Sequence, residues 1–153
     1  VEEEKGPILI CLPGLAEITR LYEELTARRE QLGSGWVIYP LHSSLSSEEQ
    51  RAVFERGGRG RRKVIVGTNI AETSITIDDV TMVIDSCRMK ENRWDAQRNI
   101  SSLQEDFVSQ ASARQRRGRA GRVKPGVCYH LVSSCRFNSF KEYQVSPLLP
   151  SPL

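Results

Sequence analysis

Short apolar runs separated by longer, more polar segments are the feature that most constrains the fold of this chain. Four such runs lie in the first 85 residues: 8–12, 36–40, 63–66 and 82–85. A short, continuous apolar run is typical of a strand that is buried on both faces. Helical patterns separate the runs, from Ala16 to Leu32 and from Ser46 to Phe54. This alternation predicts an α/β fold with a mostly parallel sheet.

The second half of the chain predicts further elements. Alternating residues predict a β-hairpin inserted over about residues 86–108. Within it, we favour strand packing over base stacking for Trp94. A last strand is expected over 126–132 and a helix over 137–143. In a parallel sheet, functional groups follow the carboxyl ends of strands, so we look for them there.

With 153 residues, the chain is long enough for one domain with a single core. We expect a polar tail at 1–5, the domain at 6–145 and a linker at 146–153. No apolar run is long enough to cross a bilayer, and the acidic start differs from a signal peptide, so we expect an intracellular protein without membrane contact.

Four cysteines and two histidines complete no zinc-binding spacing, so no metal site is expected. Cys11 and Cys128 are expected as buried apolar residues in a reducing compartment.

Positive charge is concentrated in three segments, although the formal net charge is only +3. The segments are 51–63, 88–98 and 114–124. Such clustering favours a phosphate-rich partner more strongly than the net charge does.

The densest segment is QRRGRAGR, at residues 115–122. A helix that begins near Ser109 and continues through it would gather three side chains on one face, within about 60° of one another. They are Gln115, Arg119 and Arg122. Arginine suits phosphate because its planar fork donates in pairs and stays charged. The pattern predicts a site for a phosphate with developing charge; a solvated basic helix or a nuclear-localisation-like patch would be the alternative.

QRRGRAGR is similar to motif VI of superfamily 2 helicases, in the form found in the DEAH/RHA family, and TNIAETSITID at 68–78 resembles motif V of that family. Residues 8–14 resemble motif IV. The chain is thus identified as resembling the second RecA-like domain of a DEAH/RHA-type ATP-dependent RNA helicase. The resemblance implies a three-layer, P-loop NTPase-type fold with a β-hairpin between motifs V and VI. Cys87 stands where the family usually has glycine, so we expect the turn there to differ locally.

The resemblance also implies a role for each matching residue. The catalytic group, which would act on the γ-phosphate of ATP, is Gln115, Arg119 and Arg122. The nucleotide-binding group, for the base and the ribose, is Phe54, Thr76 and Asp78. The group that would contact the RNA backbone is Ser43, Thr68 and Asn69. From the residues alone, a core position explains Phe54 almost equally well.

The chain contains neither a GxxxxGK[ST] loop nor a DExH sequence. The resemblance therefore implies that ATP, with Mg²⁺, binds to a first RecA-like domain of the same protein, and that further C-terminal domains follow. The fragment itself would be monomeric and inactive, in the cytoplasm or the nucleus. Two alternatives stay open: a non-catalytic RNA-binding or scaffold module, and a DNA helicase domain of the same superfamily, since backbone contacts alone do not separate RNA from DNA.

Overall fold

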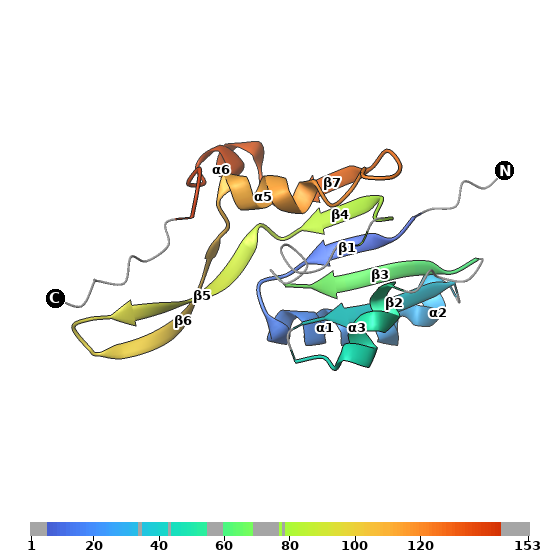
Figure 1. The fold of residues 1–153 in the computed structure, drawn as a ribbon, viewed down its shortest axis with the longest axis horizontal. Coiled ribbons are helices and arrows are strands. Elements are labelled where there is room, and N and C mark those ends of the chain that lie inside the picture. Colours follow the sequence, from blue (N-terminus) through green and yellow to red (C-terminus); the bar gives the residue numbers. More distant parts are fainter. Residues whose placement is uncertain are drawn as a thin grey trace.

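The computed structural model describes residues 6–33, 35–42, 44–54, 60–68, 77 and 79–144 (Figure 1). Within them, five parallel strands form a sheet in the order β2-β3-β1-β4-β7. The strands are β1 (Ile8–Cys11), β2 (Trp36–Leu41), β3 (Arg62–Gly67), β4 (Met82–Asp85) and β7 (Val127–His130). The predicted α/β fold with a mostly parallel sheet is confirmed.

Apolar side chains cover both faces of this sheet. On one face, α1 (Leu15–Ala27) contributes to the same apolar cluster as Ile8 of β1. The next strand residue, Leu9, belongs to a different cluster, together with Val53 of α3 (Ser47–Phe54). Because neighbouring strand residues point to opposite faces, the sheet lies between two helical layers.

The first two helical segments differ in how well their bounds were predicted. The helix expected over 16–32 is interrupted at Arg28, and α2 (Arg29–Leu32) follows that residue. The start of α3 agrees with the prediction, because Ser46 and Glu49 cap it reciprocally. The Glu49 amide donates to Ser46 Oγ at 3.2 Å, and the Ser46 amide donates to Glu49 Oε2 at 2.8 Å.

The helix α5 (Gln110–Arg117) lies beside β4 and β7 (Figure 1). It begins at Ser109, whose Oγ accepts a hydrogen bond of 3.1 Å from the Ser112 amide. Its Ala113 packs in an apolar cluster with residues of the β4–β5 junction and of the hairpin: Cys87, Met89 and Val108. The helix is therefore packed against both the sheet and the base of the hairpin.

The predicted hairpin is present as β5 (Arg88–Asp95) and β6 (Ile100–Phe107), which pair antiparallel. Figure 1 shows it extending away from the five-stranded sheet. Trp94 and Leu103 near its tip are each 62% exposed. With this exposure, the Trp94 side chain is not enclosed in a core of the described residues, and the preference for strand packing over base stacking stays a prediction.

The helix expected over 137–143 lies earlier, as α6 (Ser134–Asn138). Its cap is Ser133, whose Oγ accepts from the Arg136 amide at 3.1 Å. Residues 141 and 142 instead accept hydrogen bonds from the first amides of α5.

The predicted tail and linker lie outside the described residues. Every described helix is too short or too polar to cross a membrane.

Candidate functional site

The carboxyl ends of the five strands lie level along one edge of the sheet. From β2 to β7, the residues paired across neighbouring strands at this edge are Leu41, Gly67, Cys11, Asp85 and His130. The segments that follow the strands therefore emerge side by side. Open parallel sheets bind ligands along this kind of edge.

Thr68, predicted to contact RNA, lies at this edge. It follows β3 directly and is partly buried. The other two predicted RNA contacts, Ser43 and Asn69, lie outside the described residues, as do Thr76 and Asp78 of the predicted nucleotide group. Phe54 is the last residue of α3, and its side chain is also outside the described part.

The segment that carries Arg119 and Arg122 is not one continuous helix, because α5 ends at Arg117. One further turn follows, closed by a hydrogen bond of 3.2 Å from the Arg119 amide. Gly121 then adopts a φ of 82°, in the left-handed region that favours glycine. The prediction that Gln115 shares a single helix with both arginines is therefore wrong, because glycines end the helix early.

Beyond α5 the chain packs against the start of β4. The Gly121 amide donates to the Val80 carbonyl at 3.4 Å, and the Val127 amide donates to the Thr81 carbonyl at 3.0 Å. A Cβ at Gly126 would lie 2.6 Å from the Gly121 nitrogen, so only glycine allows this close approach. The structure thus places the end of QRRGRAGR near the amino end of β4, away from Thr68.

The three predicted catalytic residues differ in exposure. Gln115 and Arg122 are exposed, and Arg119 is partly buried. Arg122 Nε lies 3.5 Å from the Gly118 carbonyl oxygen, to which it donates. This weak contact leaves most of the Arg122 guanidinium facing outward.

Arg116, which the sequence analysis left without a role, is buried and ion-paired. It is 1% exposed, and its Nη1 lies 2.7 Å from Oδ1 of Asp85, which is fully buried. Its Nη2 donates to the Arg88 carbonyl at 3.2 Å. A carboxylate at the end of a buried strand needs such a partner, so Asp85 was a signal that one existed.

Asp85, Cys87 and His130 form a cluster whose ligand atoms lie close enough to hold one metal ion. Asp85 Oδ2 lies 3.1 Å from His130 Nδ1 and 3.5 Å from Cys87 Sγ. Burial, followed by the charge of Asp85, raises the pKa of the Cys87 thiol to about 12, so it stays protonated at neutral pH. Since Asp85 Oδ1 also accepts from the Cys87 amide at 2.8 Å and from Arg116, we interpret the cluster as a hydrogen-bonded network.

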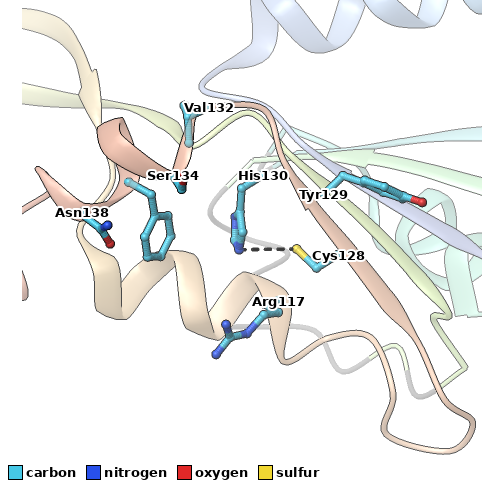
Figure 2. A pocket seen from close by; sticks show the side chains of 8 residues that line it. Arg117, Cys128, Tyr129, His130, Val132, Ser134 and Asn138 are labelled. Carbon is cyan, nitrogen blue, oxygen red and sulfur yellow. Dashed lines mark hydrogen bonds between the residues drawn. The ribbon is translucent and has the colours of Figure 1, made fainter.

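A cavity of about 360 Å³ lies between α5, β7 and α6 (Figure 2). It is lined by Arg117, Cys128, Tyr129, His130, Val132, Ser134, Phe137 and Asn138. Arg117 lies two residues after Gln115, so their side chains leave α5 in directions about 160° apart. The cavity is therefore on a different side of the helix from the predicted catalytic glutamine.

The fold and the sequence segments at its edges define a class of protein. The model of the helicase conserved C-terminal domain matches residues 1–124, and the chain belongs to this family. The E. coli DExH-box NTPase HrpB has a crystal structure that is similar, with a TM-score of 0.85 and 39% identity. That similarity covers 95% of this chain and 18% of HrpB.

Curated relatives narrow the assignment to the DExH-box type. The putative ATP-dependent RNA helicase DHX57 of Homo sapiens is 58% identical over 136 residues, which are 87% of this chain and 10% of the relative. The ATP-dependent DNA/RNA helicase DHX36 of Homo sapiens is 46% identical over 153 residues, 100% of this chain and 15% of the relative. The chain is a helicase C-terminal domain of this type, and it spans 10% to 15% of the length of these relatives.

Proposed function

We propose that this chain is the second RecA-like domain of an ATP-dependent RNA helicase, acting on ATP that a first RecA-like domain of the same protein binds. The names of the relatives support ATP use and a nucleic-acid substrate. The observation that carries the proposal is the position of QRRGRAGR, whose last residues pack beside Val80 and present Arg122 to solvent. A cation held there can meet an anion brought by another domain.

In the proposed reaction, Arg119 and Arg122 donate to the γ-phosphate and stabilise the charge that develops on it. Gln115 orients the phosphate or the attacking water. Arginine fingers of this kind are worth about 10³ to 10⁵ in rate. Mg²⁺ would be held by the first domain, where it would neutralise phosphate charge.

The remaining predicted residues would bind the rest of the two ligands. Asp78 accepts from the ribose hydroxyls with Thr76 nearby, and the Phe54 ring stacks on the base. Thr68, together with Ser43 and Asn69, contacts phosphates of the RNA backbone. Of these residues, Thr68 is described with its side chain, and it lies at the carboxyl edge of the sheet directly after β3.

Opening and closing of the two domains around ATP would turn hydrolysis into movement along one strand. The hairpin would stand at the duplex junction, where its exposed tip could meet the strand that is displaced. The chain by itself would bind each ligand with only half of the contacts, so we expect it to be inactive alone.

Arg119 and Arg122 give the direct test. In the full-length protein that contains this chain, each arginine is changed to alanine, and RNA-stimulated ATP hydrolysis and RNA affinity are measured. We expect turnover to fall about a hundredfold or more while RNA affinity is retained. The matched control is Arg114→Ala, which removes an exposed arginine of α5. Equal turnover in all variants would instead favour the non-catalytic RNA-binding module.

A DNA substrate is the second candidate, favoured by the similarity to a relative named as a DNA/RNA helicase. The proposed contacts are to backbone phosphates, which do not read the 2′-hydroxyl that separates the two nucleic acids. Competition between RNA and DNA oligonucleotides of one sequence, at one stated salt concentration, distinguishes them.

A further inference from the structure

We propose that Arg116 is a positioning residue that couples the base of the β5–β6 hairpin to the segment carrying Gln115, Arg119 and Arg122. The inference rests on the proposed function of those three residues. Its basis is that the buried Arg116 side chain binds both Asp85 and Arg88. These two residues flank the joint, residues 86–87, at which the chain passes from the sheet into the hairpin.

The joint is short. Asp85 is the last residue of β4 and Arg88 is the first residue of β5. Arg116 Nη1 lies 2.7 Å from Asp85 Oδ1, and Arg116 Nη2 donates to the Arg88 carbonyl at 3.2 Å. The planar guanidinium holds its donors in fixed relative directions. A change in the angle between β4 and β5 must therefore break one of these contacts or move the guanidinium.

The backbone within the joint is tightly held. Cys87 has a φ of 59°, a conformation that favours glycine, and its amide donates to Asp85 Oδ1 at 2.8 Å. The Cys87 carbonyl accepts from the Val108 amide at 2.9 Å, which closes the base of the hairpin where β6 returns to α5. Both strands of the hairpin therefore meet α5 at one point.

Asp85 is also held from the opposite side. His130 Nδ1 of β7 lies 3.1 Å from Asp85 Oδ2. With neighbours on both oxygens and no exposure to water, the carboxylate cannot easily follow a displaced guanidinium. Charge-assisted hydrogen bonds in such a site are strong and depend steeply on geometry.

The consequence for the proposed reaction follows from chain position. Arg116 directly follows Gln115, and its carbonyl accepts from the Arg119 amide at 3.2 Å. A shift of the Arg116 backbone therefore moves two of the three predicted catalytic residues, Gln115 and Arg119. Displacement of catalytic groups by about 1 Å can cost about 10²-fold in rate. RNA that moves the hairpin would in this way change the alignment of the groups that act on ATP.

The test uses the full-length protein with Arg116→Lys. Lysine keeps the charge beside Asp85 but cannot reproduce the two-directional fork. We expect the KM for ATP and the affinity for RNA to change less than about twofold, while the RNA-stimulated kcat falls about tenfold or more. The RNA-free kcat should fall much less, so the stimulation by RNA is lost. The matched control, Arg117→Lys, alters the neighbouring exposed arginine and should leave the stimulation unchanged.

A role in folding alone would lower the RNA-free and the RNA-stimulated kcat by the same factor, and that result would overturn the proposal. If Arg116→Lys does not fold, Asp85→Asn keeps the shape of the acceptor and should show the same selective loss. Hydrogen exchange of residues 88–107 gives a second measurement without turnover. A non-hydrolysable ATP analogue should change their protection in the wild type and not in the variant; an equal change in both would also overturn the proposal.

Two variants separate a failure of the coupling role of Arg116 from a failure of the proposed function. If Arg119→Ala lowers turnover while Arg116→Lys preserves the stimulation by RNA, the proposed function stands and the coupling role fails. If Arg119→Ala has no effect on turnover, the proposed function fails first.

Discussion

Individual buried polar groups show how closely the chemistry of this domain depends on its packing. The Asp85 carboxylate is contacted by the Cys87 amide, by Arg116 of α5 and by His130 of β7. The Cys87 Sγ lies 3.5 Å from Asp85 Oδ2. The thiol is buried beside a carboxylate, so its charged form is disfavoured by two effects that act in the same direction. The backbone of Cys87 has a φ of 59°, in the left-handed region.

The raised pKa of Cys87 predicts a loss of stability in alkali. Its pKa is about 12 in the folded protein, whereas the ordinary value is 9.0. Between these values the unfolded chain loses the thiol proton and the folded chain keeps it, so rising pH favours unfolding. The contribution is complete below about pH 9 and is lost progressively towards pH 12. Urea unfolding between pH 8 and about pH 10.5 should show the decline.

The control for this prediction is Cys87→Ala, which removes this thiol and should make the decline shallower; burial also raises the pKa of Cys128, to about 11, so part of the decline remains. Cys135 is exposed, so Cys135→Ala should leave the pH dependence unchanged. An equally steep decline in Cys87→Ala would mean that other groups cause it.

At the scale of elements, the loop after α5 is held in place by the close approach of two glycines. A Cβ at Gly126 would lie 2.6 Å from the Gly121 nitrogen and 3.0 Å from the Thr81 carbonyl oxygen. Both neighbours are backbone atoms, which cannot rotate away as a side chain can. The loop that carries Arg122 therefore depends on glycine at this position.

Gly126→Ala should destabilise the chain by about 1–3 kcal/mol, because the added methyl group must displace backbone. Gly118→Ala is the matched control, since its Cβ would meet its nearest atoms at 3.4 Å, an ordinary contact. Alanine there should change stability by less than about 1 kcal/mol. Thermal unfolding of the three proteins measures both effects, and equal melting temperatures would contradict the packing argument.

For the whole molecule, the arrangement separates two proposed ligand regions that depend on a partner domain. Thr68 lies at the carboxyl edge of the sheet, and the loop with Arg122 packs at the amino end of β4. The sequence lacks a phosphate-binding loop of the GxxxxGK[ST] type. We therefore expect the chain alone to hydrolyse ATP no faster than a buffer blank, whereas the full-length protein hydrolyses it in an RNA-dependent manner. Hydrolysis by the chain alone, retained after Arg119→Ala, would contradict this division of the site.

Much of the fold was predictable because its determinants are local. Each buried strand is a short apolar run, and the capping pair Ser46 and Glu49 lies three residues apart. The motifs are also continuous stretches, so the helicase class could be inferred before any contact was known. The end of α5 was not predicted, because the expected helix was continued through QRRGRAGR without regard to its two glycines. The exposure of Trp94 could not be predicted, since it depends on what lies against the hairpin.

The alternation of strands and helices, the parallel class of the sheet and the helicase segments could all be predicted from the residues alone, because each depends on short-range pattern. Which of the arginines in QRRGRAGR points inward depends instead on how distant segments pack. Arg116 and Asp85 are 31 residues apart, and Asp85 and His130 are 45 residues apart. A buried ion pair forms where packing brings two distant segments together and excludes water, and no local pattern encodes that meeting.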